Sequence, residues 1–98
     1  MKIYEVIEAY TDEDRYEHRI SKGLYRTKEA AEDAMHRFVD QETDRLHCIM
    51  DLNRWGVDRH FGAFDDTELP YGILYIVDYD DDMDEESCRI YVQERELE

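Results

Sequence analysis

The pattern of hydrophobic and polar positions predicts one long helix over residues 27–55. Apolar residues recur at the three- and four-residue spacing that gathers them on one side of a helix; they are Ala31, Ala34, Met35, Phe38, Leu46, Ile49 and Leu52. Thr27 suits the start, because its hydroxyl can accept a hydrogen bond from an amide of the first turn. Gly56 suits the end. We therefore expect a helix with one buried face.

Two charged residues interrupt this apolar face. Glu42 and Arg45 fall in the middle of the stripe, where the pattern otherwise requires apolar side chains. This predicts that the helix bends or breaks between Gln41 and Asp44, with Thr43 or Asp44 as the cap of a second helical piece.

Alternating polar and apolar residues predict strands on both sides of the helix. The expected strands cover residues 2–10, 16–25, 73–79 and 88–95, with turns at 11–15 and 80–87 and a long connection over 56–72. A chain of 98 residues can bury one modest core and is too short for two. The order β-β-α-β-β predicts a single α+β domain, a four-stranded antiparallel sheet with the helix packed on one face.

The predicted strands offer different residues to the two faces of this sheet. The set expected to face the helix is Ile3, Ile7, Leu74, Ile76, Ile90 and Val92. The opposite face would present Tyr4, Tyr10, Tyr75, Tyr79 and Tyr91. A face rich in tyrosine can bind a partner or a second copy of the chain. It can also be an ordinary sheet face wetted by water.

The net charge of the chain limits the classes of partner that the protein can bind. The 27 acidic residues outnumber the 12 basic ones and give a formal net charge of −15. Such a surface repels nucleic acid and anionic membranes and attracts basic proteins or cations. No apolar run approaches the roughly 18 residues of a membrane helix, and the first residues lack the apolar core of a signal peptide. We expect a soluble, cytosolic protein in which Cys48 and Cys88 are free, buried thiols.

Acidic residues also follow the polar side of the predicted helix; they are Glu29, Asp33, Asp40, Asp44 and Asp51. A continuous helix would hold them over about 33 Å, a scale on which duplex DNA presents its own line of negative charge. The acids expected to extend this ridge are Asp80, Asp81, Asp82, Asp84, Glu85 and Glu86, with Asp65 and Asp66. Phe64 is the candidate aromatic anchor for a partner. The alternatives are a solvated helix face and the general acidity of a halophilic proteome.

Catalytic, cofactor-binding and metal-binding motifs are absent from the sequence. Asp80, Asp82 and Asp84 match the first positions of a calcium loop, but Glu85 stands where that loop needs glycine. His36 and His47 would lie about 16 Å apart on a helix, too far to share one ion. We expect no catalytic residue, no cofactor and no metal, and thus no enzyme.

In size, charge and acidic ridge the chain resembles the DNA-mimicking antirestriction and anti-CRISPR proteins, small acidic proteins that phages and mobile elements encode. The run GLYRTKEAAEDAMHRF, residues 23–38, is similar to the strand-turn-helix of small phage and bacterial domains. These families share no common fold, so no residue role is carried over.

The resemblance implies an inhibitor that acts in the cytosol of a host cell. It would bind the basic groove of a DNA- or RNA-binding protein such as a CRISPR or restriction nuclease, without binding nucleic acid itself. The PAM-reading arginines of an RNA-guided nuclease would be a natural docking point. The alternative is an acidic structural or adaptor module with no inhibitory role, which can form a homodimer through the tyrosine face.

Overall fold

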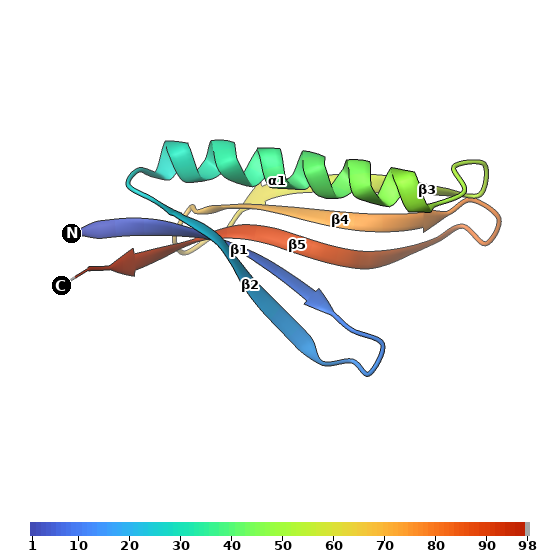
Figure 1. Cartoon of the computed structure of the whole chain (residues 1–98), viewed down its shortest axis with the longest axis horizontal. Helices are drawn as coiled ribbons and strands as arrows, with labels where there is room; N and C mark the ends of the chain where they lie inside the picture. The colour runs from blue at the N-terminus through green and yellow to red at the C-terminus, as the bar shows by residue number, and fades with distance from the viewer. Residues whose placement is uncertain (98) are drawn as a thin grey trace.

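A five-stranded antiparallel sheet carries one helix, α1 (Lys28–Ile49), on one of its faces (Figure 1). The computed structural model describes residues 1–97. Across the sheet the strands lie in the order β2 (Glu17–Tyr25), β1 (Lys2–Thr11), β5 (Met83–Glu96), β4 (Pro70–Asp78) and β3 (Trp55–Ala63). The class is α+β, but the predicted four-stranded sheet is wrong because the chain forms five strands.

The additional strand, β3, lies within the predicted long connection. It pairs antiparallel with β4 from Trp55 opposite Asp78 to Ala63 opposite Pro70. Gly56 and Gly62 concealed this strand, because glycine usually weakens a strand. Tyrosine rings cover both glycines, and a Cβ at either position would collide with a tyrosine hydroxyl, that of Tyr79 or Tyr71.

The helix is continuous through the segment where we expected it to break. Thr27 caps its start by accepting a hydrogen bond from the Ala30 amide at 3.1 Å, as predicted. Thr43 is buried, and its hydroxyl donates to the Val39 carbonyl oxygen at 2.8 Å instead of capping a new piece. Glu42 and Arg45 pair with each other along the helix. The helix ends at Ile49 and not near Gly56. Gly56 cannot end the helix because it is already a residue of β3, which begins at Trp55.

The hydrophobic core lies between α1 and the sheet. The helix contributes Ala31, Ala34, Met35, Val39 and Leu46, and the sheet contributes Val6, Leu74, Cys88, Ile90 and Val92. Leu74, Ile90 and Val92 face the helix as expected, and Ile76 packs beside them. In β1 the assignment is reversed: Tyr4 and Val6 pack into this core, whereas Ile3 and Ile7 are buried outside it. Because both sides of β1 are apolar, its alternation alone could not decide which side meets the helix.

The sheet divides at the point where β1 leaves β5. Pairing between these strands ends at Tyr10 opposite Cys88, and residues 83–86 of β5 continue beside β4 alone. The free end of the β1–β2 hairpin points away from the helix (Figure 1). Its turn is held by Asp12, whose Oδ1 accepts hydrogen bonds from the Asp14 and Tyr16 amides, both at 2.9 Å. The division opens clefts beside Glu8 and Cys88.

Within residues 1–97, no helix is both long enough and apolar enough to cross a membrane.

Candidate interaction surface and a buried carboxylate–thiol cluster

Four of the predicted acids, Glu29, Asp33, Asp40 and Asp44, lie exposed on α1 and are called the helix acids. Asp40 accepts a hydrogen bond from the Arg59 guanidinium at 2.6 Å. The other three form no ion pair within residues 1–97. The predicted ridge is thus present along the helix, with one of its carboxylates neutralised by an arginine of the same chain.

Asp51 does not belong to this row, because it follows the end of the helix. Its Oδ1 accepts a hydrogen bond from the Asn53 amide at 3.0 Å, and its carbonyl oxygen accepts one from the Trp55 amide at 2.9 Å. These bonds build the turn that leads into β3. Asp51 is exposed, and the α1–β3 turn to which it belongs lies beside the β4–β5 turn, where the Tyr79 amide donates to the Arg54 carbonyl oxygen.

The second group of predicted acids surrounds the β4–β5 turn. We call it the acidic end; its members are Asp51, Asp80, Asp81, Asp82, Asp84 and Glu85, all of them exposed. The predicted turn over residues 80–87 is too long, because β5 already begins at Met83. Asp84, Glu85 and Glu86 are therefore strand residues. Glu86 lies outside this group, since it pairs with Arg89 at 2.7 Å.

Arg54 is the basic residue within the acidic end. Its guanidinium lies 3.5 Å from an Asp78 oxygen and 3.7 Å from an Asp80 oxygen, and it stacks over the ring of Trp55. The remaining carboxylates of the acidic end have no ion-pair partner in the described chain. Like-charged groups so close together favour the arrival of an external cation or basic side chain.

An apolar cleft of about 560 Å³ lies within the acidic end. It is lined by Met50, Trp55, Ile76, Asp78, Met83, Asp84 and Glu85. Met83 is 67% exposed. Ile49 and Leu52, close in sequence to Met50, and Tyr79, next to Asp78, are exposed as well. Trp55 is half-buried and lines this cleft. Apolar side chains are thus presented beside acids, although sequence reasoning did not predict an anchor here.

Phe64 does not join the acidic surface. It follows β3 at the opposite end of β4 from the acidic end, together with the exposed Asp65 and Asp66. Its ring packs against Tyr71 and Tyr91, with centroids 5.1 Å and 6.1 Å away. The proposed anchor and most of the predicted acids therefore lie on separate parts of the molecule.

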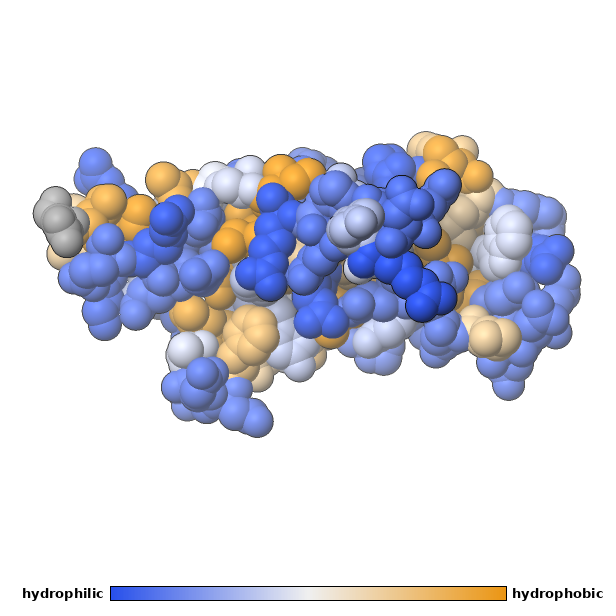
Figure 2. Space-filling model, turned by 90° about the horizontal axis from the view of Figure 1, so that it is seen from below, coloured by the Kyte–Doolittle hydropathy of each residue, from blue (hydrophilic) through white to orange (hydrophobic). Residues whose placement is uncertain are grey.

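The tyrosines divide between the two faces of the sheet. Tyr4 packs against the core beneath the helix, and Tyr10 lines a cleft with Glu42, so neither belongs to the opposite face as predicted. The face away from the helix carries Tyr71, Tyr75 and Tyr91, all half-buried. Figure 2 shows this side from below, where hydrophilic residues dominate and hydrophobic ones form separate patches.

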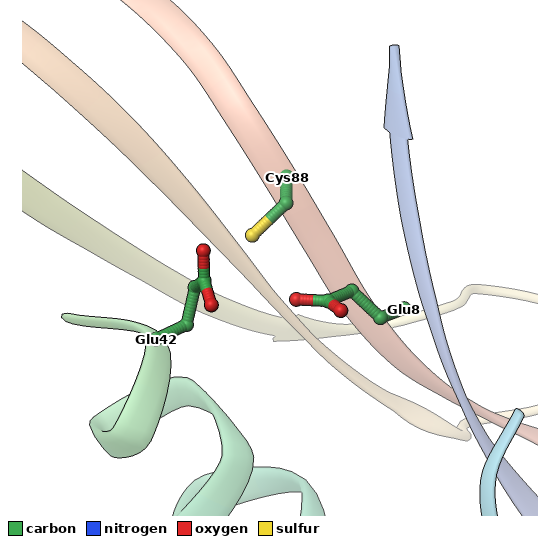
Figure 3. Close-up of side chains that lie close together, drawn as sticks. All are labelled: Glu8, Glu42 and Cys88. Atoms are coloured by element: carbon green, nitrogen blue, oxygen red, sulfur yellow. The ribbon is translucent and has the colours of Figure 1, made fainter. Parts of the chain in front are cut away.

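Three side chains that no sequence pattern linked converge where the sheet divides (Figure 3). They are Glu8 of β1, Glu42 of α1 and Cys88 of β5, and we call them the carboxylate–thiol cluster. One carboxylate oxygen of each glutamate and the Cys88 sulfur all lie within 4.8 Å of one another. Glu8 is 9% exposed and Cys88 is 4% exposed. A cleft of about 300 Å³ opens beside them, lined also by Tyr10, Arg45 and Ser87.

Each carboxylate of this cluster has one basic neighbour. Lys22 of β2 places its ammonium 3.3 Å from Oε2 of Glu8. The Arg45 Nε lies 3.0 Å from both oxygens of Glu42, and this hydrogen bonding raises the pKa of Arg45. The charges of the two glutamates are thereby balanced without any bound ligand.

The Cys88 thiol is neutral in this environment. Burial, followed by the negative charges of Glu8 and Glu42, raises the pKa of Cys88 to about 12. A protonated thiol is a poor nucleophile. Both cysteines are free as predicted, but the predicted burial holds only for Cys88, because Cys48 is exposed on the helix.

One sequence signal did point toward the cluster. Glu42 interrupts the apolar stripe of the helix, and we took this interruption as a sign of a break. A charged residue on a buried helix face can instead mark a polar site in the core. Finding its partners required the register of β1, which the sequence left ambiguous.

Comparison with protein-family profiles, with curated proteins and with solved structures found no match to this chain.

Proposed function

We propose that this protein is a non-enzymatic inhibitor that binds a basic nucleic-acid-binding protein, of the CRISPR or restriction nuclease kind, and blocks its nucleic-acid groove by charge mimicry. The observation that carries the proposal is the set of exposed carboxylates without internal ion pairs. Glu29, Asp33 and Asp44 belong to this set on the helix. Asp81, Asp82, Asp84 and Glu85 belong to it at the acidic end.

The continuous helix makes the helix charges a fixed array. Glu29 and Asp33 are one helical turn apart, about 6 Å along the axis. Spacings of this order are comparable to those between phosphates along a DNA strand. A rigid array loses little entropy when a partner's lysines and arginines bind it, which favours mimicry over a flexible acidic tail.

The apolar cleft of the acidic end supplies apolar contact area, which charged residues alone do not provide. Interfaces obtain most of their affinity from a few desolvated apolar or aromatic residues, while charges speed association and select the partner. Trp55 and Met83 are accessible there between carboxylates. The proposed partner therefore inserts an apolar or long basic side chain into this cleft, while its other basic residues meet the acids around it.

The inhibitor would act in the cytosol, where its target meets DNA. Its binding would weaken as salt screens the exposed charges, and it would compete with nucleic acid for the same groove. The protein itself would bind neither nucleic acid nor membrane, because its net charge of −15 repels both.

Charge reversal with a matched control tests this proposal. In one variant Glu29, Asp33 and Asp44 are changed to lysine. In the control Glu13, Asp65 and Asp66, which are also exposed, are changed to lysine. The two variants have the same net charge and differ only in where the charge is placed.

The measurement is inhibition of DNA cleavage by a panel of purified RNA-guided and restriction nucleases. We expect the wild type and the control to inhibit one member, and the helix variant to need at least about tenfold more protein. Equal loss in both variants would show that only total charge matters. If the wild-type protein inhibited no nuclease of the panel, the proposal of a nuclease target would be contradicted.

A structural or adaptor role is favoured by one observation, the packing of the exposed Phe64 against the half-buried Tyr71 and Tyr91 of the sheet face away from the helix. A homodimer could form through this face. Because its hydrophobic patches are separated (Figure 2), such a dimer would depend on tyrosine contacts. Sedimentation should then show a dimer that dissociates when Tyr75 and Tyr91 are changed to serine. A monomeric wild type would exclude this role for the face.

A further inference from the structure

The carboxylate–thiol cluster is an unusual arrangement for a protein interior. Its members come from three elements that the core holds rigidly, β1, α1 and β5. Burying charged groups beside one another is costly unless something compensates, and apolar residues of similar size would often be as stable or more so. Lys22 and Arg45 balance the charge of the two glutamates, but they give no reason for the thiol to lie between them.

The thiol is an independent sign of a ligand. Cys88 is 4% exposed, and its sulfur has no hydrogen-bond partner within residues 1–97. Figure 3 shows the sulfur directed toward the space between the two carboxylates. A sulfur in contact with apolar side chains alone would indicate ordinary core packing. Here the sulfur instead shares a small space with two groups that bind cations.

We infer that Glu8, Glu42 and Cys88 form a binding site for a divalent cation that accepts sulfur ligands, with Zn²⁺ as the representative ion. Zinc is bound in proteins by cysteine thiolate, histidine nitrogen and carboxylate oxygen, usually with four ligands in a tetrahedron. When the metal binds, the Cys88 thiol gives up its proton to solvent, so that one thiolate and two carboxylates would supply three ligands. The cleft beside the cluster leaves room for a water molecule as the fourth.

The distances require only a small contraction. In a tetrahedral zinc site, bonds of about 2.0–2.3 Å place the ligand atoms roughly 3.3–3.8 Å from one another. The corresponding atoms of the cluster already lie within 4.8 Å of one another. Rotation of the two flexible glutamate side chains can close this difference while the backbone of all three elements stays in place.

The basic neighbours can remain when a metal binds. Lys22 contacts only Oε2 of Glu8, so Oε1 is available to the ion. Arg45 contacts both oxygens of Glu42 and has to give up one of them. The Arg45 side chain is 58% exposed, whereas that of Glu42 is 17% exposed, so the guanidinium can shift toward solvent while one of its contacts to Glu42 remains. Donors that hold the outer oxygen of a ligating carboxylate are common around metal sites and fix the ligand in position.

The ligand set also selects among cations. Calcium needs six to eight oxygen ligands, and magnesium prefers an octahedron of oxygens and water. A buried sulfur with two carboxylates suits neither ion. Zinc, cobalt and cadmium accept sulfur, so they should bind here in the presence of excess calcium. The exposed acids of the helix and the acidic end would hold calcium or magnesium only loosely.

The test uses the full chain with Cys48 changed to serine. In this variant Cys88 is the only thiol, so any thiolate-to-cobalt charge-transfer absorption must come from the cluster. Co²⁺ is added in the presence of millimolar Ca²⁺, which occupies the surface carboxylates. We expect the absorption to rise to one equivalent of Co²⁺ and to disappear when Zn²⁺ displaces it. The absence of a thiolate band in this folded variant would overturn the inference.

Two further variants locate the site by isothermal titration with Zn²⁺. Glu42→Gln and Cys88→Ser, each made in the Cys48→Ser background, should weaken binding at least about tenfold. Glu85→Gln removes a carboxylate of the acidic end in the same background and should leave the affinity unchanged. Equal Zn²⁺ affinity in all variants would assign the binding to the surface and overturn the inference. If a cluster variant fails to fold, the cobalt spectrum of the Cys48→Ser protein, in which the cluster is intact, still tests whether Cys88 binds the metal.

Discussion

The exposed carboxylates of the acidic end and the buried carboxylates of Glu8 and Glu42 are the same chemical group in opposite surroundings. At the acidic end, acids crowd together in water with one arginine, Arg54, among them. Inside the division of the sheet, each glutamate has a basic neighbour and shares its space with a thiol. Solvent stabilises the first group, and specific partners must stabilise the second. The acidic residues of this chain therefore fall into two groups that are stabilised in different ways, one by water and the other by neighbouring side chains.

The thiols offer the largest contrast between the two environments. Cys48 is exposed on the helix, whereas Cys88 is buried with a pKa raised to about 12. At pH 8 a thiol with that pKa is ionised in only about one molecule in ten thousand. With a disulfide reagent we expect one thiol per chain to react rapidly and the second only after urea unfolding. Rapid reaction of both thiols in the folded protein would contradict the burial of the cluster.

Removing a basic partner should affect the buried carboxylate more than an exposed one. Lys22→Met keeps an unbranched side chain of similar length but removes the ammonium that faces Glu8 and lies over the Phe38 ring. We expect the free energy of unfolding to fall by about 2 kcal/mol, since a mostly buried carboxylate is left unpaired.

The matched control is Arg59→Met, which removes the partner of the exposed Asp40. It should change stability by no more than about 0.5 kcal/mol. Urea denaturation followed by circular dichroism measures both variants. Equal destabilisation by the two substitutions would show that solvent screens the charge of Glu8 to the same extent as that of the exposed Asp40.

Salt should produce the smallest of the three effects, and it acts on the exposed group. Raising NaCl from 0.1 to 1 M screens repulsion among the unpaired surface acids. We expect the free energy of unfolding in urea to rise by about 1 kcal/mol. The variant with Glu29, Asp33 and Asp44 changed to lysine should gain less. A wild type whose stability falls with salt would indicate that attractive ion pairs, and not repulsion, dominate the surface.

The sequence predicted those parts of the fold in which one side of an element was clearly apolar. The start of the helix at Thr27 and the inward side of β5 are examples. Prediction failed where tertiary contacts compensate for a local weakness. Tyr71 and Tyr79 cover the glycines of β3, and Thr43 bonds back to Val39 within a continuous helix. Neither compensation can be seen in the local pattern.

The candidate sites were predictable to different degrees. Acids on the helix could be placed on one side from their spacing alone, because helical geometry is local. The acidic end and its cleft depend on the α1–β3 turn lying beside the β4–β5 turn, where the Tyr79 amide donates to the Arg54 carbonyl oxygen. The carboxylate–thiol cluster combines residues 8, 42 and 88. Only the strand order and the register of β1 bring these positions together.

The first and last described residues lie side by side, since the Leu97 amide donates to the Met1 carbonyl oxygen at 2.8 Å. Both ends of the chain lie far from the acidic end (Figure 1). A purification tag, a fluorophore or a surface linker attached at either terminus would therefore leave the Trp55 cleft facing solution. A short peptide joining the termini would circularise the chain without crossing that cleft, and new termini could be opened at the hairpin turn near Asp14.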